Sequence, residues 1–227
     1  MKLFKFLLFS IGLVMLSNTA HALPKGFTYV TDARFIYSLN YATNDNIIGR
    51  PLNGYHQKKC ILTTQAADAL IKVQNDLDTL NKGYRILIYD TYRPVDAVKD
   101  FKKWSEDLAD QKNKQAYYPN LDKATFFDLG YIAEKSSHNR GSTIDLTIMQ
   151  CDNAQTCKPL DMGTIIDFMD VTANTDNPSI SNTAKANRKF LVEIMKKNGF
   201  ENLPLEWWHF TLNNEPFPDT YFNFPVQ

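Results

Sequence analysis

The chain has 227 residues, and its 25 basic and 25 acidic side chains give a formal net charge of zero. With neither a basic excess nor a run of Lys and Arg, the composition argues against nucleic acid or an anionic membrane surface as a partner. The length suits one domain with a substantial hydrophobic core, and we expect a single domain over residues 23–227.

The first 22 residues have the pattern of a secretory signal peptide. Two lysines precede an apolar run over residues 6–16, and Ala20-His21-Ala22 fits the small-x-small cleavage rule. A membrane anchor is the alternative, but the run falls short of the roughly 20 apolar residues of a spanning helix. We therefore expect cleavage after Ala22 and a periplasmic or secreted protein without a membrane anchor. Cleavage removes two basic residues and no acidic one, so the mature chain has a net charge of −2.

The three cysteines suit an oxidising compartment. Cys151 and Cys157 bracket a short polar loop, and so close a pair can form a disulfide outside the cytosol, which leaves Cys60 as a buried thiol. The alternative is three unpaired cysteines that pack as small apolar residues. A zinc site made of cysteines is disfavoured because the chain has no CxxC spacing.

The first clear elements of the mature chain are a strand and a helix. Residues 34–39 alternate as in a strand, and a polar loop follows them. Apolar residues then recur at helical spacing over residues 63–80. A Thr at the start can cap this helix, and Gly83 stands where a C-terminal cap belongs.

A second strand and helix follow directly. Residues 84–89 predict a buried strand, and Pro94 suits the first turn of a helix over residues 95–108, with Leu108 on its apolar face. Arg93 therefore lies at a strand-to-helix junction, where side chains from a rigid frame often reach an active site. By position alone, however, an arginine before a proline is more often an ordinary surface residue.

The central stretch, residues 136–148, carries two metal-ligand candidates. His138 and Asp145 are separated by a tight turn at Gly141, after which a strand continues through residues 146–149. Such a strand holds Asp145 at its start while the turn folds His138 back beside it.

The last third of the chain predicts a turn, a helix and a strand. Residues 160–164 form a compact turn, and a helix over residues 184–198 stops at Gly199. The segment 206–212 then reads as a strand that carries Glu206 and His209.

These residues together supply the parts of a hydrolytic zinc site. Catalytic zinc takes three protein ligands and leaves a fourth position for water, which matches His138, Asp145 and His209. Glu206 is then free to act as general base on the metal-bound water, and Arg93 is the cation best placed to stabilise the oxyanion. The HExxH helix motif is absent, which indicates a different zinc peptidase architecture.

Four motifs resemble those of the D-alanyl-D-alanine dipeptidases of the VanX type, within the larger group of zinc peptidases that includes D,D-carboxypeptidases and hedgehog domains. The motifs occur in the same order and cover nearly all of the mature chain. They are SxHxxGxxxD at 136–145, ExWH at 206–209, Tyr-Arg-Pro at 92–94 and Asp-Met-Gly-Thr at 161–164. The resemblance implies an α+β fold in which helices pack on a mainly antiparallel sheet that carries one zinc ion.

The resemblance also implies a role for individual residues. It matches His138, Asp145 and His209 to the zinc ligands, Glu206 to the general base and Arg93 to the transition-state cation. Positions that line a small D,D-dipeptide pocket are matched by Asp161, Tyr41, Tyr55 and Ser136. An acid suits that pocket because a buried ammonium needs a partner. The alternative for Asp161 is a plain turn residue, and for the tyrosines it is ordinary packing, which is the commoner role of a tyrosine.

The expected export departs from the family pattern, because many relatives act in the cytoplasm. We therefore expect a role in scavenging dipeptides released by cell-wall turnover. Two alternatives stay open. One is a D,D-carboxypeptidase or endopeptidase acting on peptidoglycan stem peptides, and the other is a zinc-stabilised binding module without turnover. Retention of Glu206 and Arg93 disfavours the module, since a structural zinc needs neither.

Overall fold

The computed structural model describes residues 22–152 and 156–227; of the expected signal peptide at 1–22, all but Ala22 lies outside them. Its α-helices are α1 (Thr64–Thr79), α2 (Val95–Glu106), α3 (Lys114–Tyr117) and α4 (Asn182–Lys197). The strands are β1 (Phe27–Tyr29), β2 (Ile36–Tyr37), β3 (Ile61–Thr63), β4 (Tyr84–Asp90), β5 (Thr143–Cys151), β6 (Cys157–Pro159), β7 (Phe200–Asn202) and β8 (His209–Leu212). Four 3-10 turns complete the described elements: η1 (Asn40–Ala42), η2 (Lys123–Thr125), η3 (Ser137–Arg140) and η4 (Val171–Ala173).

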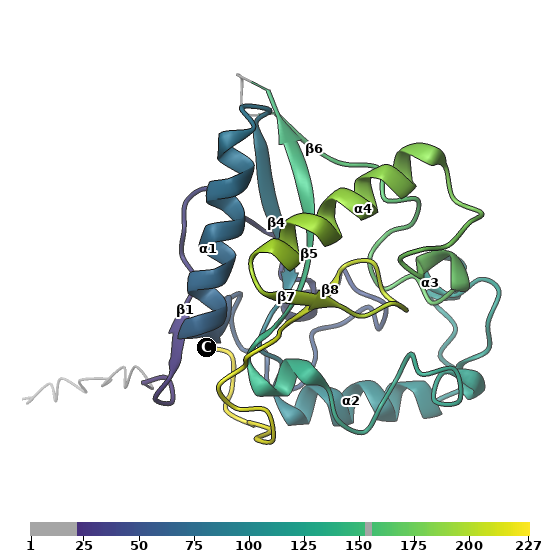
Figure 1. The fold of residues 1–227 in the computed structure, drawn as a ribbon. Coiled ribbons are helices and arrows are strands. Elements are labelled where there is room, and N and C mark those ends of the chain that lie inside the picture. The colour runs from purple at the N-terminus through teal and green to yellow at the C-terminus, as the bar shows by residue number, and fades with distance from the viewer. Residues whose placement is uncertain (1–21, 153–155) are drawn as a thin grey trace, which may run out of the picture.

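The main sheet has the strand order β2-β4-β5-β8-β7, and β6 pairs with β5 beside this path. The β2–β4 pair is parallel and the other pairs in this sheet are antiparallel. In Figure 1, α1 and α4 lie along the sheet and α2 crosses near its lower end. The prediction of an α+β fold with a mainly antiparallel sheet is therefore confirmed. None of the described helices is long and apolar enough to cross a membrane.

The largest core lies between the sheet and the two long helices. Ile144, Leu146 and Ile148 from β5 face it, together with apolar residues of α1 and α4. Because side chains alternate across a strand, Asp145 and Thr147 point to the opposite face. That opposite face carries the candidate site.

The predicted helices form, with different ends. Thr63 caps α1 by accepting from the amide of Ala66, but the helix ends before the expected glycine cap, and Asn81 takes the left-handed conformation with φ of 52°. Gly83 is needed for another reason: a Cβ there would collide with the Cys151 carbonyl. In α2, Leu108 falls beyond the helix end and is 55% exposed, so its predicted place on the apolar face is wrong.

Two predicted strands are shorter than expected. The strand over residues 34–39 reduces to Ile36–Tyr37, and the one over 206–212 begins only at His209. The residues before His209 form a turn instead, in which the Glu206 amide donates to the Leu203 carbonyl at 2.9 Å. Helix α4 begins two residues earlier than predicted, because Ser181 caps it through the amide of Ala184.

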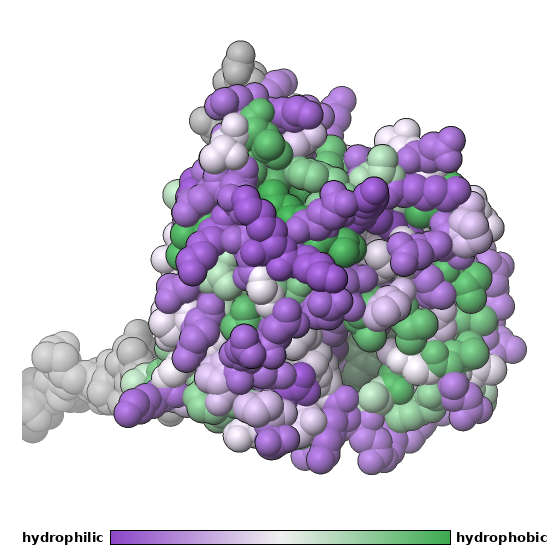
Figure 2. All heavy atoms as spheres, viewed as in Figure 1, coloured by the Kyte–Doolittle hydropathy of each residue, from purple (hydrophilic) through white to green (hydrophobic). Residues whose placement is uncertain are grey.

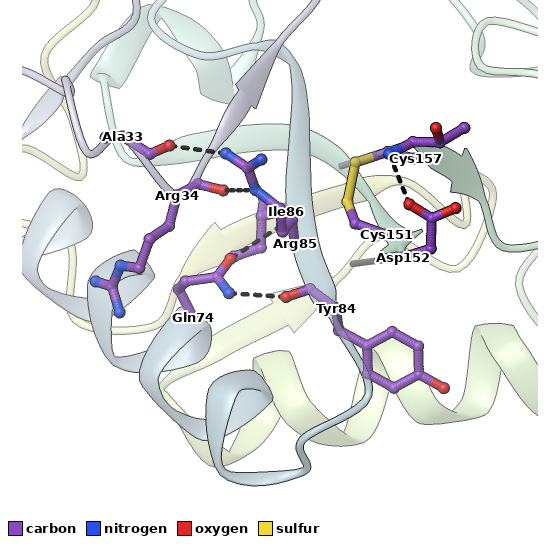
Figure 3. Close-up of a disulfide and its surroundings, with 10 residues drawn as sticks. Ala33, Arg34, Gln74, Tyr84, Arg85, Ile86, Cys151, Asp152 and Cys157 are labelled. Atoms are coloured by element: carbon purple, nitrogen blue, oxygen red, sulfur yellow. Dashed lines mark hydrogen bonds between the residues drawn. A yellow bond between two sulfur atoms is a disulfide. The ribbon is translucent and has the colours of Figure 1, made fainter. Parts of the chain in front are cut away.

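A disulfide joins Cys151 to Cys157 between β5 and β6, and Cys60 is buried and free, as predicted. Figure 3 shows it near the start of β4. There the buried Gln74 of α1 donates to the Tyr84 carbonyl and accepts from the Ile86 amide, both at 3.0 Å. This end of β5 is held together independently of the end that carries the candidate site.

We expect the double variant Cys151→Ala with Cys157→Ala to lose about 2 kcal/mol of unfolding free energy, since the bridge closes a short loop. Urea unfolding with and without reductant measures the change. Reductant should lower the midpoint of the wild type and leave that of the double variant unchanged. Hydrolytic activity at low temperature should persist, because Asp145 lies six residues, or about 20 Å, along the strand. If reductant shifted the unfolding midpoint of both proteins equally, the stabilising role of the disulfide would be contradicted.

Candidate active site and metal centre

Strand pairing places two of the candidate ligands, Asp145 and His209, in one row across the sheet. Asp145 on β5 lies opposite Asp90 on β4 and opposite His209 on β8. A register shift between Ile88 and Asp90 accompanies the first pairing. Directly opposite residues on neighbouring strands have their side chains on the same face and in contact. The imidazole of His209 therefore meets the carboxylate of Asp145.

His138 reaches the same point from the 3-10 turn η3. Ser136 caps this turn by accepting from the His138 amide, while Asn139 accepts from the Ser136 amide. Gly141 ends the turn at φ of 80°, where a Cβ would collide with the Phe27 ring. The Nδ1 of His138 lies 2.6 Å from the Thr91 carbonyl, to which it donates. That bond leaves the lone pair on Nε2, which faces the carboxylate of Asp145.

The distances within this trio fit a metal ion. His138 Nε2 lies 3.1 Å from Asp145 Oδ2, His209 Nδ1 lies 3.2 Å from Asp145 Oδ1, and the two imidazole nitrogens are 3.3 Å apart. Two ligands of a tetrahedral zinc ion, each at about 2.0 Å from the metal, lie roughly 3.3 Å apart. The buried Asp145 Oδ1 accepts no hydrogen bond from the described residues, as suits an atom that binds a cation. The trio thus has both the donor types and the spacing of a zinc site.

The electrostatics of the trio also favour bound positive charge. Burial disfavours the charged form of Asp145, yet the two neighbouring imidazoles hold its pKa below the usual value. Burial likewise disfavours charged His209, but Asp145 and Glu206 raise its pKa to about 9. A bound metal ion would supply the positive charge near the carboxylates of Asp145 and Glu206 that the proton on His209 otherwise supplies.

Glu206 lies beside the trio on the turn that precedes β8. Its Oε2 is 3.4 Å from His209 Nδ1, and its side chain is 17% exposed. Asn202 on β7 holds the turn by donating to the carbonyls of Glu206 and His209, both at 3.0 Å. The carboxylate is therefore next to the metal-binding atoms and still open to solvent.

Arg93 approaches the trio from the other side. Its Nε donates to Asp90 at 2.9 Å, its Nη2 donates to Asp145 Oδ2 at 3.3 Å, and its guanidinium stacks on Tyr41 with Cζ 4.8 Å from the ring centroid. Asp90 also accepts from the Tyr55 hydroxyl at 2.6 Å. Although burial alone would lower the pKa of Arg93, these neighbours keep it above its usual value. The guanidinium is thus charged and held rigidly at the metal-binding atoms.

A cavity of about 390 Å³ opens onto this cluster. Figure 2 shows the surface hollowed between α2 and the β7–β8 region, with hydrophobic residues inside the recess. Asp167 projects into the cavity, and the Tyr41 hydroxyl lies 3.0 and 3.1 Å from its two oxygens. Burial, and then the charge of Asp145, raise the pKa of Asp167 to about 7. This acid has no cation bonded to it among the described residues, so it can accept one from a ligand.

Most residues singled out from the sequence meet at this cavity. Those that line it are Tyr41, Arg93, Ser136, His138, Asp145, Glu206 and His209. Tyr55 lies behind Arg93 and contacts Asp90, outside the cavity lining.

The placement of Asp161 corrects a prediction. Asp161 is exposed and lines a separate pocket, where it accepts from the Gly163 amide at 2.9 Å and from the Ser181 hydroxyl at 3.4 Å. Its side chain is occupied in shaping a turn. The acid that reaches the candidate site is Asp167, six residues later.

Sequence reasoning missed Asp167 and Asp90 as members of the site. A signal for Asp167 was present, since it is an acid between Ile166 and Phe168 in an otherwise apolar stretch. An acid in such a setting requires a polar partner or a functional reason for its burial. Asp90 directly follows the strand predicted over residues 84–89, and site residues often lie at such strand ends.

A trio that could hold a metal ion, beside a carboxylate and an arginine at a small cavity on an α+β fold, is the arrangement of a metallopeptidase. The family model described as "D-ala-D-ala dipeptidase" matches residues 28–227. A D-alanyl-D-alanine dipeptidase of Enterococcus faecium is 39% identical, covering 89% of this chain and 98% of its own.

Two further relatives agree with this match. D-alanyl-D-alanine dipeptidases of Enterococcus faecalis and Streptomyces coelicolor are 42% and 38% identical, and each alignment covers 84% of this chain and 92% of the relative. The chain therefore belongs to the D-Ala-D-Ala dipeptidase family.

Proposed function

We propose that this protein hydrolyses free D-Ala-D-Ala with one zinc ion held by His138, Asp145 and His209. The observation that carries this proposal is the trio itself, whose ligand atoms all lie within 4.8 Å of one another at the base of a small cavity. When bound, zinc supplies a Lewis acid that activates water near neutral pH and polarises the substrate carbonyl.

Two side chains beside the trio have the proposed catalytic roles. Glu206, with its carboxylate 3.4 Å from His209, takes a proton from the attacking water and passes it to the departing amine. Arg93, charged and fixed by two carboxylates, stabilises the oxyanion that develops on the scissile carbonyl. Because Arg93 is held in place before substrate arrives, little reorganisation is needed during the reaction.

Asp167 is proposed to bind the ammonium of the substrate. A free dipeptide brings a positive charge into the cavity, and burying it requires a paired carboxylate. Asp167 is buried and hydrogen-bonded to the Tyr41 hydroxyl, which orients its oxygens. Ser136 lines the same cavity beside the His138 turn and is proposed to contact the substrate there.

We expect Asp167→Asn to raise KM for D-Ala-D-Ala by about 10- to 100-fold, because a charge-assisted hydrogen bond of roughly 1.5–3 kcal/mol is lost. The pKa of Asp167 is raised to about 7, so in the free enzyme its carboxylate becomes neutral as the pH falls through that value. Wild-type KM should therefore rise below pH 7. Steady-state kinetics over pH 5.5–8.5 test this. If the KM of the wild type changed with pH in the same way as the KM of Asp167→Asn, the proposed role of Asp167 would be contradicted.

The proposed substrate is tested by measuring alanine release from D-Ala-D-Ala by the zinc-loaded protein, beside L-Ala-L-Ala and a cell-wall pentapeptide. Cleavage of the D,D-dipeptide alone is the expected result. Release of alanine from the pentapeptide without dipeptide cleavage would replace the proposal with a D,D-carboxypeptidase. If the zinc-bound protein released alanine from none of the three substrates, a binding module without turnover would be favoured.

We propose further that the enzyme is exported and scavenges dipeptides released during wall turnover. The signal-like residues 1–22 and the disulfide between Cys151 and Cys157 support this, since disulfides persist mainly outside the cytosol. Cell fractionation and N-terminal sequencing test it. A mature chain that begins at Leu23 in the exported fraction is expected, and an uncleaved protein in the cytoplasm would contradict the proposal.

A further inference from the structure

Asp167 is presented by a loop that has little regular structure of its own. Residues 162–174, here called the acceptor loop, contain only the short turn η4 near their end. Asp167 takes the left-handed conformation with φ of 58°, which is uncommon for a residue other than glycine. Such a conformation persists only when the surrounding contacts determine it. The position of the Asp167 carboxylate therefore depends on what holds the loop.

Arg188 on α4 holds both ends of the acceptor loop. Its Nε donates to the Met162 carbonyl at 2.7 Å, its Nη1 to the Asn174 carbonyl at 2.7 Å and its Nη2 to the Thr172 carbonyl at 3.0 Å. The side chain is only 1% exposed, and burial lowers its pKa to about 10. Burying a charged group whose hydrogen bonds go to backbone carbonyls is costly, so these three bonds indicate a role in holding the loop rather than in the surface charge of α4.

The same arginine joins the acceptor loop to the turn that carries Glu206. Its Cζ lies 5.9 Å from the ring centroid of Trp207, the residue after Glu206. The Trp207 indole donates to Thr164 Oγ1 at 2.8 Å, and its backbone amide donates to the Ala173 carbonyl at 3.2 Å. Both of these hydrogen bonds from Trp207 go to the acceptor loop. Arg188 and Trp207 thus form one buried junction between the segments that carry Asp167 and Glu206.

From this junction we infer that Arg188 is a positioning residue that sets the separation between the ammonium acceptor Asp167 and the general base Glu206. This inference rests on the proposed function. In a dipeptide the free ammonium is one residue from the scissile bond, so a fixed separation selects a substrate with a free amine at that position. Arg188 touches neither the substrate nor the metal ligands, and it acts through the acceptor loop.

The test compares Arg188→Met with Lys123→Met. Lys123 is a matched control, because it is also buried, donates to the carbonyls of Trp104 and Asp107 at 3.1 and 3.0 Å, and lies over an indole, but does so against α2. For each zinc-loaded variant, kcat and KM are measured on D-Ala-D-Ala and on N-acetyl-D-Ala-D-Ala, with zinc content and unfolding midpoint alongside.

We expect Arg188→Met to lower kcat/KM for the free dipeptide by about 100-fold, mostly through KM, since an ångström of misplacement costs about that much. The preference for the free over the acetylated dipeptide should fall at least about 10-fold, while zinc content stays at the wild-type value. Lys123→Met should lower the unfolding midpoint and leave that preference intact. An unchanged preference in Arg188→Met, or an equal loss in both variants, would overturn the inference.

Two further variants keep the inference testable if Arg188→Met does not fold. Arg188→Lys keeps the charge but cannot reach all three carbonyls, and Trp207→Phe keeps an aromatic ring beside Arg188 but removes the indole N–H that bonds Thr164. Each should reduce the preference for the free amine, and full retention by both would overturn the inference. A failure of the proposed function can be told apart from a failure of this inference, because in the first case the wild type itself would not cleave D-Ala-D-Ala.

Discussion

Replacing Glu206 with alanine is expected to lower kcat by about 10³-fold while the protein still binds one zinc ion, because a positioned general base contributes roughly 10²–10⁴-fold. The carboxylate lies 3.4 Å from His209 but is not one of the three atoms that fit the metal. The fold should tolerate the change, since the side chain is partly exposed and the turn is held by the backbone carbonyl of Glu206. Initial rates on D-Ala-D-Ala and metal analysis of the purified variant measure both quantities.

Two companion variants make this result specific. Glu201 on β7 lines the same cavity, so Glu201→Ala removes a carboxylate from the cavity without touching the trio and should keep most of the activity. His209→Ala should lose the metal as well as the activity, because it removes one of the three ligand atoms. Undiminished activity of Glu206→Ala at normal zinc content would rule out the proposed base.

Replacing Arg93 with alanine is expected to lower kcat by about 10²- to 10³-fold, the usual effect of removing one oxyanion-stabilising group. Zinc content should change much less, since the guanidinium bonds Asp145 without being a ligand itself. Arg93→Lys should recover only part of the loss, because an ammonium cannot bridge Asp90 and Asp145 in the same planar geometry. Single-turnover rates at saturating substrate isolate the chemical step.

Arg85→Ala is the matched control for Arg93→Ala. Arg85 is on β4, the strand that precedes Arg93, and donates to the carbonyls of Ala33 and Arg34, which lie away from the cavity. Its loss should affect stability and leave kcat near the wild-type value. If Arg93→Ala stripped the zinc or unfolded the chain while Arg85→Ala did not, Arg93 would be a structural residue and the proposed role in the transition state would fail.

The fold was predicted well wherever a local pattern carried the information. The apolar repeat over residues 63–80 and the run at 84–89 became α1 and β4 with small errors at their ends. The short strands β1, β3 and β7 were not predicted, because three-residue segments have too few residues to show a period. They form because partner strands satisfy their backbone groups: β1 and β3 pair with each other across a long stretch of chain, and β7 pairs with the nearby β8.

The sequence by itself determined the chemistry of the candidate site. His138 and Asp145 lie seven residues apart across one turn, and Glu206 lies three residues before His209, so each pair is brought together by its own short segment. The motif order was enough to indicate the family. It was also enough to place Arg93 at a strand end, where it reaches the trio.

Which acid enters the cavity depends on the tertiary structure. Asp161 and Asp167 lie six residues apart, and although the apolar neighbours of Asp167 signal its burial, they do not show which cavity it faces. Asp161 is retained at the surface by Gly163 and Ser181, while Asp167 is turned inward on a loop held by Arg188, which follows it by 21 residues. The physical reason is that burial of a carboxylate depends on packing between distant segments, which no short-range pattern encodes.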